Sequence, residues 1–137
     1  MTVLKAYNSN TGQWEPILVG STGPQGLQGP QGPAGSLADA QTISTIADSY
    51  VVSSTDAGKM LTCTKATAMT ISIPNGIGLT AGQRVDFLQL GAGQVTFAST
   101  GATVSSTPGL KLRAQYSAAT LFCVATNVYV LIGDLSA

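Results

Sequence analysis

Short runs of alternating apolar and polar residues follow one another from about residue 50 to the end of the chain. They are rich in β-branched side chains, and Gly, Pro, Asn and Asp separate them at intervals near ten residues. Such spacing is typical of an antiparallel sandwich or barrel. We therefore predict that residues 49–137 form an all-β domain, called the head below, with strands at 50–52, 60–64, 69–73, 84–90, 94–98, 119–124 and 128–132.

The last of these runs is apolar on both of its faces. Side chains alternate across a strand, so Val128, Val130 and Ile132 point away from Tyr129 and Leu131. A central strand of a compact sandwich has this pattern, and so does a strand covered by its own core on one side and by a neighbouring subunit on the other. We favour the second interpretation and predict that Val128, Val130 and Ile132 lie in a trimer interface.

Residues 20–37 are six unbroken triplets with glycine in the first position. A collagen triple helix requires this period, because every third residue lies at a crowded axis where no Cβ fits. The segment would form a stalk about 50 Å long. The alternative is a flexible Gly/Pro/Gln linker, but the strict period favours a homotrimer whose axial residues are Gly20, Gly23, Gly26, Gly29, Gly32 and Gly35.

The stalk has few of the residues that stiffen a triple helix. Only Pro24, Pro30 and Pro33 occur in it, so we expect a trimerising domain at one or both ends to hold it in register. Residues 38–48 form a neck between stalk and head. Its apolar residues recur every three positions, which suits either a short turn on the trimer axis or an extended segment.

Residues 1–19 precede the stalk and read as strand, turn and strand over 2–7, 8–12 and 13–19, with Asn and Gly in the turn. An isolated hairpin is marginal in water, and this one is too short to bury its own apolar residues. We expect either that its three copies pack together or that a partner covers it. The predicted attachment residues of this β anchor are Val3, Leu4, Tyr7, Trp14, Pro16, Ile17 and Leu18.

Trp14 is the only tryptophan of the chain. Large amphipathic aromatic side chains dominate the binding energy of many interfaces, so we favour insertion of Trp14 into a pocket on a partner. The alternative is that three copies of Trp14 pack around the trimer axis.

Composition narrows the possible functions. Charged residues make up 9% of the 137 residues, and the formal net charge is zero. The chain therefore has no excess of positive charge that would attract nucleic acid or an anionic membrane. No apolar run approaches the roughly 20 residues of a membrane helix, and the first residues lack the pattern of a secretory signal. We expect synthesis in a cytoplasm, with no nucleic-acid partner and no membrane insertion.

Catalysis is not expected. The chain has no histidine, which removes the commonest general base, and its carboxylates are scattered along the sequence. Gly91-Ala92-Gly93 is interpreted as a hairpin turn and Asp56-Ala57-Gly58-Lys59 as a turn, because neither has the flanking residues of a nucleotide loop. Cys63 and Cys123 fit no metal or redox motif and are either two core residues or a disulfide. No catalytic residue, cofactor or metal site is predicted.

Several stretches resemble the fibre and decoration proteins of tailed bacteriophages, especially those of actinobacterial hosts. The resemblance covers nearly the whole chain, and its most specific part is the run Gln-Leu-Gly-Ala-Gly-Gln-Val-Thr-Phe at 89–97. The other matching stretches are 14–16, the triplets, 56–59, 73–74 and 130–135. The resemblance implies a homotrimer whose N-terminus grips the capsid or the tail, whose stalk projects, and whose β-rich tip faces solvent.

We therefore expect a structural virion protein that decorates the capsid as a head fibre, with the major capsid protein or another virion protein bound through residues 1–19. The short segment before the stalk favours the head over the tail. The alternative is a tail fibre or receptor-binding protein whose tip adheres to host surface glycans, for which Tyr50, Tyr116 and Tyr129 are the candidate aromatic contacts.

Overall fold

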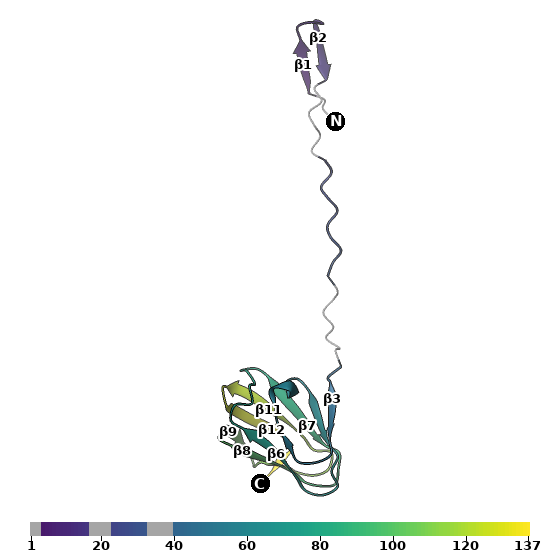
Figure 1. The fold of residues 1–137 in the computed structure, drawn as a ribbon. Coiled ribbons are helices and arrows are strands. Elements are labelled where there is room, and N and C mark those ends of the chain that lie inside the picture. Colours follow the sequence, from purple (N-terminus) through teal and green to yellow (C-terminus); the bar gives the residue numbers. More distant parts are fainter. Residues whose placement is uncertain (1–3, 17–22, 33–39) are drawn as a thin grey trace. The chain divides into compact units, whose positions relative to one another are not determined.

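The computed structural model describes residues 4–16, 23–32 and 40–137. The chain divides into two compact units, one within residues 1–37 and the other within residues 38–137. Figure 1 shows both units, which are described separately below.

The first unit contains an antiparallel hairpin of β1 (Lys5–Asn8) and β2 (Gln13–Pro16). Its turn is closed by a backbone hydrogen bond of 2.8 Å from the Gly12 nitrogen to the Asn8 oxygen, and Gly12 has a φ of +68°, which glycine adopts without strain. The prediction of strand, turn and strand is confirmed for these residues.

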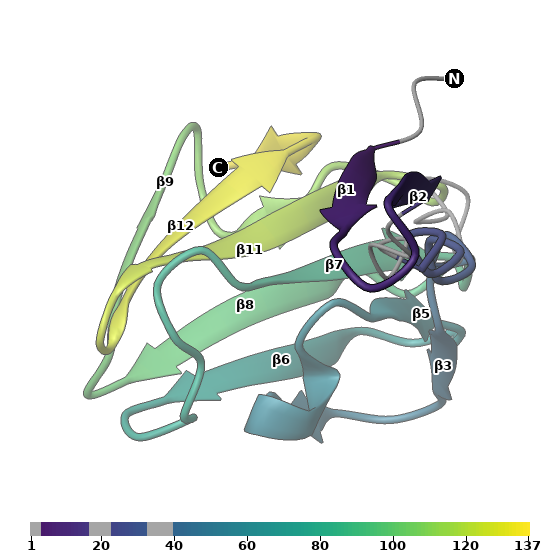
Figure 2. The same ribbon diagram turned by 90° about the horizontal axis from the view of Figure 1, so that it is seen from above.

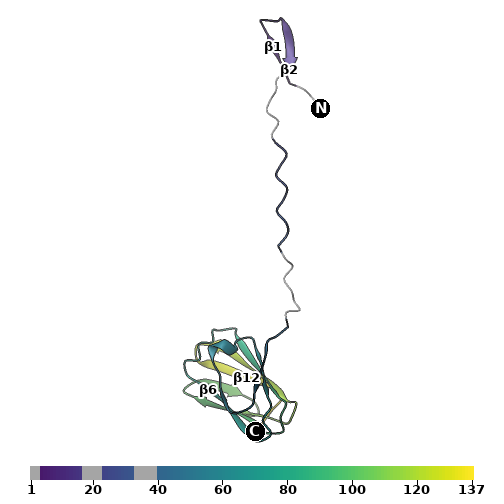
Figure 3. The same cartoon turned by 45° about the vertical axis from the view of Figure 1, so that its right-hand side comes forward.

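The described triplets, residues 23–32, form an extended segment with no hydrogen-bonded secondary structure, and every residue in it is exposed (Figures 1 and 3). An extended, solvated backbone is the conformation that a polyproline-like strand requires. The same conformation is also open to a linker, so the backbone of one chain does not distinguish the two interpretations.

The second unit, the head, is a sandwich of two mixed β-sheets. The six-stranded sheet has the order β3 (Ile43–Ile46), β5 (Met60–Cys63), β7 (Arg84–Gln89), β11 (Ala118–Ala125), β12 (Val128–Gly133) and β9 (Thr103–Ser106). The five-stranded sheet has the order β13 (Leu135–Ser136), β10 (Lys111–Leu112), β8 (Val95–Thr100), β6 (Met69–Pro74) and β4 (Tyr50–Val51). Among the described residues the only helical element is the 3-10 turn η1 (Ser54–Asp56).

All seven predicted strands of the head are present, and the all-β class is confirmed. The prediction of antiparallel pairing was wrong for much of the sandwich. From β3 to β11 successive strands alternate between the two sheets, so β3, β5 and β7 pair in parallel, as do β4, β6 and β8. Antiparallel pairing joins β7, β11 and β12, and it joins β8, β10 and β13. Alternating side chains indicate a half-buried strand but not the direction of its neighbour.

The core lies between the two sheets, which Figure 2 shows with β11 beside β12 in one and β6 beside β8 in the other. Phe87 of β7 and Phe97 of β8 meet edge to face across it, with ring centres 5.0 Å apart. Inward side chains of β6 (Met69, Ile71 and Ile73) are buried as the alternation predicted. Large aromatic and aliphatic side chains therefore join the sheets from both sides.

Gly91-Ala92-Gly93 is not a hairpin turn, contrary to the prediction. It connects β7 to β8, which belong to different sheets. Its glycines are needed for close approach, since a Cβ on Gly93 would lie 1.8 Å from the Thr67 carbonyl oxygen. The Gly93 nitrogen donates to the Lys65 oxygen at 3.1 Å, and this bond holds the connection against the 64–67 loop.

Cys63 and Cys123 are free and buried. They lie on β5 and β11, with β7 between these strands, so about two interstrand spacings, roughly 10 Å, separate their strands. A disulfide needs Cα atoms no more than about 7 Å apart. Burial raises the pKa of the Cys63 thiol to about 11. Both residues therefore serve as small core side chains, and the disulfide alternative does not apply to this fold.

Candidate interaction surfaces

The N-terminal hairpin carries an exposed aromatic face. Tyr7 and Trp14 lie directly opposite each other in the hairpin register, and their rings meet edge to face at 5.5 Å. They are 56% and 66% exposed. The other face is polar: Glu15 accepts hydrogen bonds from Asn8 at 3.1 Å and from Thr11 at 3.0 Å. The hairpin thus presents a preformed aromatic pair on one side only.

The remaining predicted attachment residues are only partly described. Leu4 is 63% exposed and Pro16 is also exposed. Val3, Ile17 and Leu18 lie outside the described residues. The role of all these residues in attachment stays a prediction.

Glycine in the described triplets has no explanation within a single chain. A Cβ added at Gly23, Gly26, Gly29 or Gly32 would meet nothing within 4 Å, and none of the four has a positive φ. Gly93 of the head, in contrast, is required by its own neighbours. Gly20 and Gly35 lie outside the described residues.

The face assignment predicted for β12 is confirmed. Tyr129 and Leu131 are fully buried in the core, whereas Ile132 is 61% exposed and Val128 and Val130 are half-buried. These three residues therefore point outward from the six-stranded sheet. Their membership in a trimer interface stays a prediction.

The outward apolar side chains extend well beyond β12. The strand registers place Phe122 of β11 beside Val130, and Phe122 is 37% exposed. Isolated exposed apolar residues are ordinary, but several on one outer face are typical of an interaction surface. Asp86 and Thr120 separate the two main groups here, one on β3 and β5 and the other on β11 and β12. We call this set the apolar face; its members are Ile43, Met60, Leu88, Phe122, Val124, Val128, Val130 and Ile132. The sequence alone did not reveal it, because residues in several of these runs were equally compatible with the core.

The outer face of the five-stranded sheet has a different character. Its two central strands, β6 and β8, present small or polar side chains outward, namely Thr70, Ser72, Thr96 and Ala98. Such side chains are well solvated and need no cover. The two outer faces of one sandwich therefore differ in the area of apolar surface that they leave in water.

Two shallow hollows adjoin the apolar face. One, of about 330 Å³, is lined by residues 105–107 of the β9 end and 130–133 of β12. The other, of about 440 Å³, is lined by Phe122, Arg84 and the loops at 57–58 and 82–83. In the described part of the chain no three His, Cys, Asp or Glu side chains come together as metal ligands. Each hollow is open to a side chain of another molecule. Neither is lined by an acidic group paired with a basic one.

A polar cluster lies in the middle of the apolar face. Asp86 of β7 is 8% exposed, and its carboxylate accepts hydrogen bonds from the Gln41 amide at 2.6 Å and from the Thr120 hydroxyl at 2.5 Å. The Arg84 guanidinium lies 3.6 Å from the same carboxylate. Gln41 belongs to the predicted neck, of which Ile43–Ile46 form β3 at the edge of the six-stranded sheet, and its side chain lies on the outer side of that sheet.

Of the three tyrosines considered for glycan contact, only one is available. Tyr129 is fully buried, whereas Tyr116 is 71% exposed. The Tyr50 hydroxyl donates to the buried carboxylate of Asp56, 3.0 Å from each oxygen. Burial, and then this hydrogen bond, raise the pKa of Tyr50. Tyr50 therefore supports the η1 turn.

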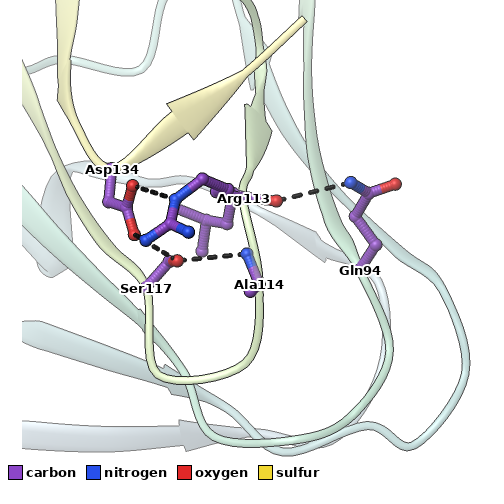
Figure 4. Close-up of polar contacts among 6 residues, drawn as sticks. Gln94, Arg113, Ala114, Ser117 and Asp134 are labelled. Carbon is purple, nitrogen blue, oxygen red and sulfur yellow. Dashed lines mark hydrogen bonds and ion pairs between the residues drawn. The ribbon is translucent and has the colours of Figure 1, made fainter.

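A second polar cluster lies where the β10–β11 loop meets the chain between β12 and β13 (Figure 4). The Arg113 guanidinium donates to both Asp134 oxygens, at 2.6 and 2.8 Å, and the Ser117 hydroxyl donates to the same carboxylate at 2.6 Å. Ser117 in turn accepts from the Ala114 nitrogen at 3.1 Å. The cluster joins the β10–β11 loop to the connection between β12 and β13, so its role is structural.

No protein-family model, curated protein or solved structure matches the chain. In the residues that the structure describes, no helix is long and apolar enough to cross a membrane.

The Arg113–Asp134 cluster predicts a pH dependence of stability. Hydrogen bonds from Arg113 and Ser117 lower the pKa of Asp134 below its ordinary value of 3.8, so the folded state favours the ionised carboxylate. Its stabilisation is complete above about pH 4 and is lost as the pH falls through the lower, folded-state pKa. Asp134→Asn should lower the thermal midpoint at pH 7, and the difference from wild type should disappear near pH 2.

Thermal unfolding followed by circular dichroism across this pH range provides the measurement. Asp48→Asn is the comparison variant: the hydrogen bond from Lys65 also lowers the pKa of Asp48, but Asp48 is 79% exposed, so its pH-dependent contribution to stability should be smaller than that of Asp134. A constant difference between wild type and Asp134→Asn at all pH values would contradict the assignment.

Proposed function

We propose that this chain is a structural virion protein, a homotrimeric capsid decoration protein or head fibre of a tailed bacteriophage. Residues 1–19 anchor it to the major capsid protein or another virion protein, residues 20–37 form a collagen-like stalk, and the head projects from the particle. The observation that carries the proposal is the glycine period, which the described part of a single chain does not require.

The glycine period, rather than the backbone conformation, favours three chains. In a triple helix each glycine is packed against two other backbones, and its missing side chain is the condition for that packing. The four described glycines of the triplets lie in open space within their own chain. Leu27, between two of them, is fully exposed, as a residue on the outside of a triple helix is.

The head and the anchor fit complementary roles in this assembly. A triple helix of six triplets with few prolines needs a domain that holds its chains together, and the head has a core of its own and an apolar face left over. The hairpin exposes an aromatic pair, and few other contacts stabilise the hairpin. Three weak anchors on one trimer bind a symmetrical shell far more tightly than a single anchor.

The proposal assigns no enzymatic activity to the chain. Its carboxylates are occupied by structural partners, as Asp86, Asp134 and Asp56 show, and neither hollow contains a nucleophile beside a base. The location that we propose is the outer surface of the capsid, with the tail as the alternative. Imaging of purified particles with and without the protein distinguishes the two, because density disappears from one of them.

The stalk is tested by a substitution at the axis. Gly26→Ala introduces a Cβ that a triple helix cannot accommodate but that a single chain accepts freely. We expect wild type to resist thermolysin, which cleaves before leucine, and Gly26→Ala to be cut at Leu27 about tenfold faster or more, as a loss of roughly 1.4 kcal/mol implies when opening is fast.

Gln28→Ala is the matched control, since it also flanks Leu27 but occupies a position outside the axis. If residues 20–37 are a linker, wild type should be cut readily, and each substitution should change the rate only as much as it does in a short single-chain peptide of the same sequence; that result would refute the triple helix.

The anchor is tested at Trp14. Truncation of a buried interface tryptophan costs about 2–4 kcal/mol, and the loss is multiplied over three copies, so Trp14→Ala should abolish retention on washed particles. Gln13→Ala, on the opposite face of the hairpin, should be retained as wild type is. Light scattering of the free protein separates the two roles of Trp14: a Trp14→Ala protein that no longer forms the trimer points to packing of three anchors around the axis.

A second candidate function is a receptor-binding tip that adheres to host surface glycans. The exposed Tyr116, with its unusual φ of +70°, favours it, because residues held in sparsely populated conformations cluster at functional sites. This function predicts saturable binding of the full chain to host cells that Tyr116→Ala abolishes and the neighbouring Gln115→Ala preserves. Binding that is absent, or unaffected by Tyr116→Ala, would eliminate this candidate.

A further inference from the structure

We propose that the apolar face of the six-stranded sheet is the surface through which three heads pack together, and that each head contacts the next through opposite ends of this face. The inference rests on the proposed homotrimer and deepens it, because it identifies which of the two outer faces turns toward the trimer axis.

The path of the neck is the first reason. Gln41 precedes β3, and its side chain crosses the outer side of β5 to reach Asp86 on β7. The Thr42 oxygen accepts from the Met60 nitrogen at 2.9 Å, which fixes the backbone at the same place. The chain therefore enters the head along the apolar face rather than along the five-stranded sheet.

Covalent geometry brings this entry point close to the axis. Gly35, the last glycine of the triplets, precedes Gln41 by six residues, and six residues span at most about 20 Å. Three chains that leave one triple helix together must therefore place their three Asp86–Gln41 contacts around a common axis within that reach. The side of the head that holds Gln41 and Asp86 therefore lies within that distance of the end of the triple helix that we propose.

A single row of side chains across the sheet shows how neighbouring heads meet. The strand registers align five residues from one margin to the other, in the order Ile43, Met60, Asp86, Thr120 and Ile132. The two end residues are 67% and 61% exposed. The row is thus apolar at both margins and polar at its centre, where the neck is bound.

A ring of three copies requires two separate contact patches on each head. Contacts around a threefold axis are heterologous, so each copy presents two different patches, one to each neighbour. Ile43 and Met60 form one patch, and Ile132 and Val130, beside the hollow at the β9 end, form the other. Large apolar side chains at both patches gain stability when water is removed.

The polar centre of the face is compatible with burial between the three heads. Asp86 is already paired with Gln41, Thr120 and Arg84 within its own chain. An unpaired carboxylate buried between subunits would be strongly destabilising, whereas one whose bonds are complete before assembly is not. The neck contact therefore prepares the centre of the face for burial.

The outer face of the five-stranded sheet provides the matched control. Val51 of β4 is 58% exposed on that side of the sandwich, close to the exposure of Ile132, and it is also β-branched. A charge at Val51 remains in water in the assembly that we propose. A charge at Ile43 or Ile132 is buried against a neighbour.

The experiment measures the mass of the full-length chain by light scattering at micromolar concentration. Wild type and Val51→Asp should have about three times the chain mass of 13.8 kDa, and Ile43→Asp and Ile132→Asp should each fall to the mass of one chain. Circular dichroism verifies that each variant is folded; where an aspartate variant is not, Ile→Ser at the same position tests the same contact.

Each result decides a distinct point. A monomeric wild type contradicts the proposed homotrimer itself. A trimeric wild type with both isoleucine variants still trimeric overturns the present inference while leaving the homotrimer intact. A loss of the trimer in only one of the two variants also overturns it, because a ring needs both patches. Variants that stay trimeric but detach from particles would assign the apolar face to the shell instead.

Discussion

The chain crosses from one sheet of the head to the other after almost every strand, and this crossing determines which strands can become neighbours. From β3 to β8, strands two apart in sequence pair in parallel because the intervening strand lies on the opposite side of the core. The connections must pass close to one another at the ends of the sandwich, which is why Gly91 and Gly93 lie where a Cβ would overlap the backbone of the 64–67 loop. The core, the outer faces and the site of the neck all follow from this winding.

Three parts of the chain have features that contacts within one copy do not explain. The described triplets have glycines with no neighbours, the hairpin exposes an aromatic pair, and the head exposes more of its large apolar side chains on the outer face of the six-stranded sheet than on that of the five-stranded sheet, where Val51 is exposed. Other copies of the chain account for the first and third of these in the assembly that we propose, and a virion surface accounts for the second. The Gln41–Asp86 contact fixes the chain just before β3 to the outer side of the six-stranded sheet.

Local pattern predicted the strands well because alternation is a property of consecutive residues. Met69, Ile71 and Ile73 are buried as expected. Tyr129 and Leu131 lie in the core and Ile132 on the outer face, also as expected. The short strands β3, β9, β10 and β13 were missed, since two to four residues carry too little pattern to be recognised. Parallel pairing was missed for a different reason: side chains alternate in the same way whether the neighbouring strand is parallel or antiparallel. The apolar face was missed because Phe122 and Met60 look like core residues until the sheet is assembled.

The sequence by itself determined the all-β class, the hairpin, most strand positions and the strict glycine period, because these depend on side-chain alternation, turn residues and a repeat that can be read one residue after another. Only the tertiary structure decided that the sandwich is mixed, that Cys63 and Cys123 are separated by β7, and that the neck binds the outer side of the six-stranded sheet. Those features depend on contacts between residues far apart in the chain, such as Gln41 with Asp86, and no local pattern encodes which distant partner a side chain will meet.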